Sequence, residues 1–220
     1  MRNGRITSFV LVFILAILMG CVSDTTPNTP PLSNKTTTVV CIGDSITRGD
    51  STTPTYPESL ARLTGFTTIN KGVNGETTDN IYARFMSDVI NQSPDYVVIL
   101  GGQNDISLNV PPSRIKINIQ SMVVEARAYN ITPVLCTIMP SDKHNSTQNA
   151  IRSELNTWIS EYGKTNNITV VDLFKTFGAP ENEYKFDPDY TSDGTHPTAA
   201  GNVLMAATIH KAVWEKTECA

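Results

Sequence analysis

The sequence predicts an α/β domain built on a parallel sheet. From Thr38 onward, short β-branched runs alternate with longer segments in which apolar residues recur at helical spacing. The run VVIL at positions 97–100 is apolar throughout, which is typical of a strand covered by helices on both faces. With 220 residues, 40% of them hydrophobic, the chain has about the length of one ordinary domain and enough apolar side chains for its core.

Five strands and five helices are expected in order along this domain. The strand candidates are the β-branched runs at residues 38–43, 67–70, 96–101, 133–138 and 169–172. A helix from Pro112 to about residue 129 is indicated by the spacing of Ile115, Ile119, Met122, Val123 and Ala126. The other helices are expected to open at Pro57-Glu58, to start at Thr77-Thr78-Asp79, to span residues 148–162 and to follow Pro197.

Charge and cysteine content argue against two classes of function. Lys and Arg total 17 against 21 acidic residues, a net charge of −4, and no basic run stands out, so a nucleic-acid partner is not expected. The four cysteines include no C-x-x-C pair, the spacing that would indicate a zinc site.

The first 37 residues differ in composition from the rest. Arg2 and Arg5 precede eleven consecutive apolar residues at positions 9–19, a length typical of a signal peptide and too short for a spanning helix. This run ends in LMGC, which resembles the bacterial lipoprotein box, although Met19 stands where a smaller residue is usual. We therefore predict a signal peptide at 1–20 and an exported protein, anchored to the outer face of the cell membrane through a lipid on Cys21. Ordinary cleavage with secretion, or a plain anchor helix, are the alternatives.

A linker is expected to follow Cys21. The segment up to residue 37 contains three prolines and many Thr, Asn and Ser residues, a composition typical of an exposed, extended tether. The folded domain is then expected to span residues 38–220.

Polar residues follow several predicted strands, at the edge of the sheet where such folds place their sites. Ser45 lies in GDSIT after the first strand; Thr47 replaces the second glycine of a nucleophile elbow, which disfavours an ordinary α/β-hydrolase. Gly75 lies in NKGVNGETT, either a loop whose amides face an anion or a simple turn. Asn104 lies in GGQND after the third strand, where its amide could donate to an oxyanion or merely cap a turn.

The histidines fall into two groups. In DGTHP, Asp193 precedes His196 by three residues, so its carboxylate can orient the imidazole and leave the other ring nitrogen free as a base. His144 lies in a polar stretch and His210 within the last helix, and for both a surface or helix-face position is expected.

Taken together, these four blocks resemble those of the GDSL-type esterases, or SGNH hydrolases, over about residues 38–215. The resemblance implies a flavodoxin-like three-layer α/β/α sandwich with five parallel strands. It implies that Ser45 is the nucleophile, His196 the general base and Asp193 its orienting carboxylate. It further implies an oxyanion hole made by the backbone N–H groups of Ser45 and Gly75 and the amide of Asn104, with no metal or organic cofactor.

The loops and the residues beside the four blocks indicate the substrate class. The loops are short and leave no room for a lid domain, so an open site for small acyl groups, acetyl above all, on carbohydrate or lipid alcohols is expected. Arg48, Tyr56, Gln103 and Tyr190 lie beside the four blocks and are candidates for contacting the substrate. A catalytically inactive glycan-binding surface lipoprotein is the main alternative. A flavin- or phosphate-binding module is disfavoured because the GDSIT turn is too short to cradle a phosphate.

Overall fold

A central parallel sheet carries the five predicted strands. The computed structural model describes residues 36–215, so the predicted signal peptide, Cys21 and all but the end of the linker lie outside the described residues. The strands are β1 (Thr38–Gly43), β2 (Thr67–Gly72), β3 (Tyr96–Leu100), β4 (Thr132–Cys136) and β5 (Thr169–Val171). They pair in parallel in the order β2-β1-β3-β4-β5, the strand order of the flavodoxin-like fold. The predicted fold class is therefore confirmed.

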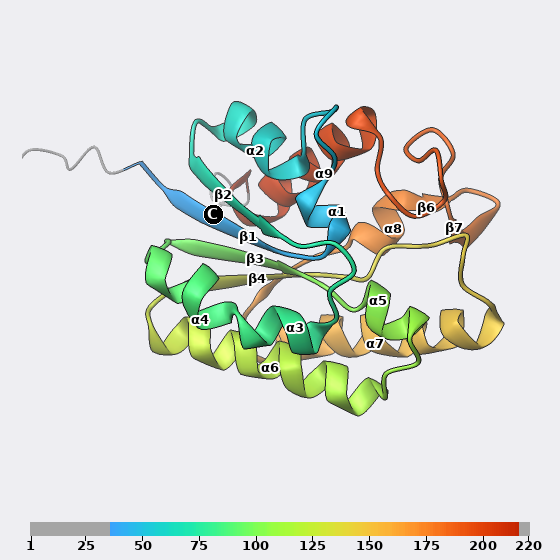
Figure 1. Cartoon of the computed structure of the whole chain (residues 1–220), viewed down its shortest axis with the longest axis horizontal. Coiled ribbons are helices and arrows are strands. Elements are labelled where there is room, and N and C mark those ends of the chain that lie inside the picture. Colours follow the sequence, from blue (N-terminus) through green and yellow to red (C-terminus); the bar gives the residue numbers. More distant parts are fainter. Residues whose placement is uncertain (1–35, 216–220) are drawn as a thin grey trace, which may run out of the picture. The chain divides into compact units, whose positions relative to one another are not determined.

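Helices cover both faces of this sheet and complete three layers (Figure 1). One face carries α2 (Tyr56–Thr64), α8 (Leu173–Phe177) and α9 (Ala199–Val213), and the other carries α3 (Thr78–Ala83), α4 (Phe85–Asp88), α6 (Pro112–Ala128) and α7 (Ser146–Thr165). Because side chains alternate along a strand, Val39 and Cys41 of β1 pack into one apolar core, while Val40 and Ile42 pack into the other. The VVIL run of β3 divides between the two cores in the same way.

Capping residues explain where the helices start. Thr55 and Glu58 form a capping box at α2, with the Thr55 N–H donating to Glu58 Oε2 at 2.9 Å. Asn145 and Gln148 form another at α7. The last helix begins at Ala199, two residues beyond Pro197, because the Thr198 hydroxyl accepts from a backbone N–H of its first turn.

Several short elements were not predicted. The helices α1 (Ser45–Arg48) and α5 (Gln103–Ser107) directly follow β1 and β3. A 3-10 turn, η1 (Ile90–Gln92), precedes β3, and β6 (Gly178–Ala179) and β7 (Asn182–Phe186) form a small antiparallel hairpin. Segments this short contain too few residues to display a period, so hydrophobic spacing could not reveal them.

A helix must be about 20 residues long and largely apolar to cross a bilayer. Between residues 36 and 215, none is both long and apolar enough to cross a bilayer.

Candidate active site

The four blocks meet at the carboxyl edge of the sheet. Strand β1 pairs with β2 on one side and with β3 on the other, so this edge contains the topological switch point at which such folds bind ligands. Ser45 begins α1 after β1, Gly75 lies between β2 and α3, and Asn104 lies in α5 after β3. Asp193 and His196 come from the loop that precedes α9.

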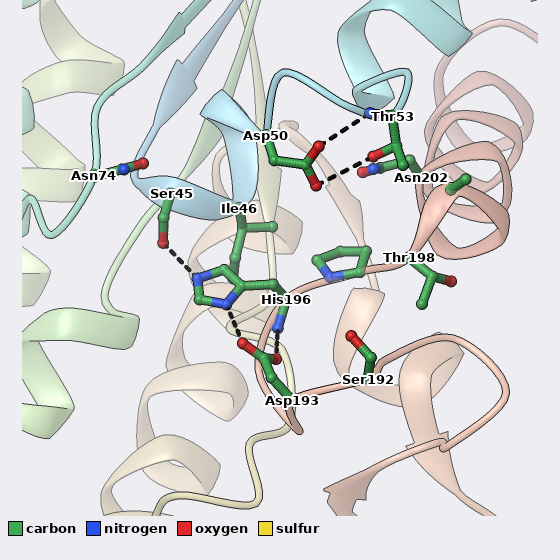
Figure 2. Close-up of a pocket in the computed structure, with 13 residues that line it drawn as sticks. Ser45, Ile46, Asp50, Thr53, Asn74, Ser192, Asp193, His196, Thr198 and Asn202 are labelled. Carbon is green, nitrogen blue, oxygen red and sulfur yellow. Dashed lines mark hydrogen bonds and ion pairs between the residues drawn. The ribbon is translucent and has the colours of Figure 1, made fainter.

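Ser45, His196 and Asp193 form a continuous chain of hydrogen bonds (Figure 2). Ser45 Oγ is 2.9 Å from His196 Nε2, and His196 Nδ1 is 2.7 Å from Asp193 Oδ2. Asp193 Oδ1 accepts from the backbone N–H groups of Thr195 and His196, each at 2.8 Å. Thr191 Oγ1 donates to the His196 carbonyl oxygen at 2.7 Å, and this bond closes the turn that carries Asp193 and His196.

The charge of Asp193 sets the tautomer of the imidazole. Partial burial favours a higher pKa for this carboxyl, but hydrogen bonds from the His196 ring and from the backbone N–H groups of His196 and Thr195 outweigh it and lower the pKa to about 2. An ionised Asp193 can only accept, so Nδ1 of His196 carries the proton. Nε2 is then free to accept the hydroxyl proton of Ser45.

Glycines at the ends of β1 and β2 allow α1 to start directly above the sheet. A Cβ at Gly72 would overlap the backbone of Arg48, and one at Gly43 would overlap the carbonyl oxygen of Leu100. The Asp44 side chain then caps α1, because its Oδ1 accepts the N–H of Ile46 at 2.9 Å. Close packing of α1 against the strand ends therefore sets the position of Ser45.

Asp44, the residue before Ser45, is buried and is 1% exposed. Burial raises its pKa to about 6, although the N–H of Ile46 and the charge of His196 oppose the shift. Its Oδ2 lies 3.4 Å from Asn104 Nδ2. The turn that carries Ser45 and the turn after β3 are thus joined through a single carboxyl.

Asn104 and Gly75 line one cavity together with Ser45. Asn104 Nδ2 donates to the carbonyl oxygen of Glu76 at 2.9 Å, which ties α5 to the loop after β2. Gly75 adopts φ +74°, a conformation that glycine reaches without strain. Within residues 36–215, its backbone N–H has no hydrogen-bond acceptor, so it remains available to a ligand.

Arg84 connects the ends of β1 and β2 to this loop. Its guanidinium donates to the carbonyl oxygen of Gly43 at 3.0 Å and to that of Lys71 at 2.8 Å. It also forms ion pairs with Glu76 at 2.6 Å and with Asp88 at 2.8 Å. The five hydrogen-bonding N–H groups of a planar guanidinium make arginine suited to such a junction.

Two cavities adjoin Ser45 and His196. The first, about 440 Å³, is called here the Asp50 cavity, and Figure 2 shows most of its walls. It is lined by Ser45, Ile46, Gly49, Asp50, Thr53, Asn74, Ser192, Asp193, His196, Pro197, Thr198, Ala199 and Asn202. The second, about 350 Å³, is called the Gln103 cavity and is lined by Ser45, Asn74, Gly75, Gln103, Asn104, Ser107, Ser141, Lys143, Thr195 and His196.

The four predicted substrate-contacting residues have different positions. Gln103 lines the cavity named after it, and Arg48 lines a shallow hollow beside Asp50. Tyr56 does not reach the site: as the first residue of α2 it is fully buried in the core, and its hydroxyl lies 3.3 Å from Thr47 Oγ1. Tyr190 lines neither of the two cavities, because its ring packs edge-on against Phe177.

His144 was wrongly expected at the surface. It is 9% exposed, its Nε2 lies 2.7 Å from Ser107 Oγ, and its Nδ1 is hydrogen bonded to the guanidinium of Arg152. No sequence pattern indicates this contact, because it depends on how the loop after β4 folds against α5. His210, by contrast, lies on α9 as expected.

Comparisons with known proteins agree on one family. The model of the GDSL-like lipase/acylhydrolase family matches residues 41–204. An acetylxylan esterase from Geobacillus stearothermophilus is 25% identical over 164 residues, which are 69% of this chain and 71% of that protein. The crystal structure of a GDSL-like lipase from Bacteroides thetaiotaomicron superposes with a TM-score of 0.70 and 30% identity, covering 81% of this chain and 88% of that one.

A further relative is a lipoprotein. The chain is 32% identical over 117 residues to the uncharacterized lipoprotein YqeF of Bacillus subtilis. That match covers 46% of this chain, and it spans about half of the relative, 48% of its length.

We expect Asp44 to make the protein less stable at neutral pH than at pH 4. Its pKa of about 6 in the fold lies above its ordinary value of 3.8, so the unfolded chain releases this proton first. The free energy of unfolding therefore falls as pH rises from about 4 to about 6, by about 3 kcal/mol for this group. Asp44→Asn, whose side chain is neutral at every pH, should lack this fall.

Urea unfolding of both proteins at pH 4, 5, 6 and 7 provides the measurement. Stability curves that run parallel across this range would contradict the expectation.

Proposed function

Because the chain belongs to the GDSL-like lipase/acylhydrolase family, and is therefore an enzyme that hydrolyses acyl esters, we propose that Ser45 is its nucleophile, with His196 as general base and Asp193 as the carboxylate that orients it. One observation carries this proposal: the continuous hydrogen bonds from Ser45 through His196 to Asp193, of 2.9 and 2.7 Å. The geometry matches what a serine–histidine–aspartate triad requires, whatever the order of its residues in the chain.

The proposed reaction has two halves. Ser45 Oγ attacks the ester carbonyl carbon while its proton passes to His196 Nε2. The carbon–oxygen bond to the alcohol then breaks, His196 returns the proton to the leaving oxygen, and the acyl group stays on Ser45. Water attacks this acyl-enzyme by the same route, and the carboxylic acid leaves as Ser45 regains its proton.

The negative charge on the substrate oxygen needs donors in both halves. We assign this role to the backbone N–H groups of Ser45 and Gly75 and to Asn104 Nδ2. Two observations support the assignment: among residues 36–215 the N–H of Gly75 has no acceptor, and one N–H of the Asn104 amide is held by the carbonyl oxygen of Glu76, which fixes the direction of the other. Such donors act strongly because they are held in place before the charge forms.

We propose small acyl esters, acetyl esters above all, of carbohydrate or lipid alcohols as substrates. The Asp50 cavity, at about 440 Å³, lies in the lower part of the usual range for ligand pockets. It contains Asp50 and Asp193 beside only a few apolar side chains, which disfavours long acyl chains. The relative from Geobacillus stearothermophilus, named an acetylxylan esterase, points in the same direction.

For the N-terminus we propose a signal peptide at 1–20, a lipid on Cys21 and a tether up to residue 37 that presents the hydrolase domain of residues 38–220 outside the cell. The LMGC sequence and the lipoprotein YqeF, similar over 46% of this chain, support this anchoring. The alternative is simple cleavage and secretion.

Anchoring is tested by expressing the full chain in a bacterium that is fed an alkyne-bearing fatty acid. The wild-type protein should be labelled and sediment with membranes, whereas Cys21→Ser should lose the label. Equal labelling of both proteins would exclude lipidation at Cys21.

Replacing Ser45 or His196 by alanine is expected to lower kcat on p-nitrophenyl acetate by at least about 10³-fold, because each removes a group that takes part in bond making. Asp193→Ala should have a smaller effect, since an orienting carboxylate acts through the histidine. Ser51→Ala, in the loop after α1, and His210→Ala, on α9, are matched controls that should keep most activity.

Retention of more than a few per cent activity in the Ser45 or His196 variant would refute the assignment. A fluorophosphonate probe separates the enzyme from an inactive glycan-binding lipoprotein, because only an activated Ser45 becomes labelled.

Arg84→Lys is expected to lower kcat roughly 10- to 100-fold with little change in KM, because small displacements of catalytic groups have effects of this size. Lysine keeps the charge but cannot bridge both strand ends and Glu76 at once. Arg114→Lys is the control, since Arg114 forms an exposed ion pair with Asp79. Guanidinium added to Arg84→Ala should restore part of kcat, and a change confined to KM would argue against this role.

A further inference from the structure

The two cavities differ in the chemistry of their walls. The Asp50 cavity includes the apolar side chains of Ile46, Pro197 and Ala199. Every residue that lines the Gln103 cavity, in contrast, is polar or glycine. The carbon atoms of these side chains also add apolar surface, so the cavity can contact both the hydroxyl groups and the carbon face of a ring. The walls of the Gln103 cavity suit a ligand that carries hydroxyl groups.

The side-chain amide of Gln103 is buried in this wall without a partner. The residue is 5% exposed, and among residues 36–215 neither its Nε2 nor its Oε1 has a hydrogen-bond partner. Unpaired buried polar groups destabilise a fold and are rare in native proteins. A primary amide can both donate and accept, so a sugar hydroxyl, which does the same, matches it.

A chain of polar side chains holds the helix that carries Gln103. Arg152 is fully buried and can only donate, so the Nδ1 of His144 that it contacts must accept. The imidazole proton is therefore on Nε2, which donates to Ser107 Oγ at 2.7 Å. Ser107 in turn donates to the carbonyl oxygen of Gln103 at 3.1 Å.

This chain keeps its direction at neutral pH. Burial, together with the charge of Arg152, lowers the pKa of His144 to about 4, so the imidazole stays neutral. No carboxylate lines the Gln103 cavity, and Lys143 is its one permanent charge. Its volume of about 350 Å³ is near the lower end for ligand pockets, which favours a small ring over an extended chain.

We propose that the Gln103 cavity is a subsite for an uncharged sugar ring that carries the ester, with Gln103 as the residue that determines specificity. This inference rests on the proposed esterase function and extends it. The acyl group lies in the Asp50 cavity, and the leaving alcohol is a sugar hydroxyl. His144 and Arg152 are positioning residues, because they act on Gln103 only through Ser107.

Gln103→Leu tests the subsite. Leucine removes both polar atoms at similar volume, and it leaves no buried group unpaired. We expect the kcat/KM ratio of an acetylated methyl glucoside to p-nitrophenyl acetate to fall about tenfold, through a higher KM for the sugar ester. An unchanged ratio would overturn the proposal.

Asn202→Leu is the matched control. Asn202 is a buried amide in the Asp50 cavity, 3% exposed, and its Oδ1 also has no partner among the described residues. Its replacement should not lower the ratio. An equal fall in both variants would show that the loss is not specific to the Gln103 cavity and would equally overturn the inference.

The wild-type protein gives a second measurement that does not depend on a variant folding. Methyl glucoside should inhibit the hydrolysis of p-nitrophenyl acetate by the wild-type protein, and it should inhibit the Gln103→Leu variant less. Hexan-1-ol should inhibit the wild-type protein more weakly than methyl glucoside does. Stronger inhibition by hexan-1-ol would refute a sugar subsite while leaving the esterase intact. A wild-type protein that hydrolyses neither ester would instead refute the proposed function itself.

Discussion

The end of β1 is the constraint on which the rest of the site depends. This strand pairs with β2 on one side and β3 on the other, so three loops leave the same edge of the sheet within reach of one another. Gly43 and Gly72 let α1 pack directly on that edge, and the Arg84 guanidinium donates hydrogen bonds to the carbonyl oxygens of Gly43 and Lys71 there. Ser45 and the donors around it are positioned by backbone packing more than by their own side chains.

Two carboxyl groups close to Ser45 and His196 in the fold behave differently. Asp193 is half exposed and receives hydrogen bonds that keep it ionised, so it can balance a positive charge on His196. Asp44 is buried and holds its proton more tightly. The same residue type thus serves as a fixed charge in one place and as a structural cap in the other, because solvation and hydrogen bonding differ.

Sequence patterns predicted the features that depend on residues close together in the chain. They did not predict the features that depend on contacts between distant segments. Continuous apolar runs such as VVIL located the strands within a residue or two, and the rule that sites form at strand ends brought the four blocks together. The prediction that Tyr56 contacts the substrate was wrong. Tyr56 is close to Ser45 in sequence, but α2 begins directly after Thr55 and places Tyr56 in the core. Arg84 and His144 could not be recognised, since their partners come from other loops and strand ends.

The distance along the chain between the two halves of the site has a consequence for biosynthesis. Ser45 and His196 are separated by 151 positions, and the imidazole comes from the last loop before the final helix. A nascent polypeptide or an N-terminal fragment that ends before this loop contains Ser45, Gly75 and Asn104 but lacks His196. Under the proposed mechanism such a fragment is expected to be inactive on esters, so ester hydrolysis would report a chain that has been translated and folded past its last loop.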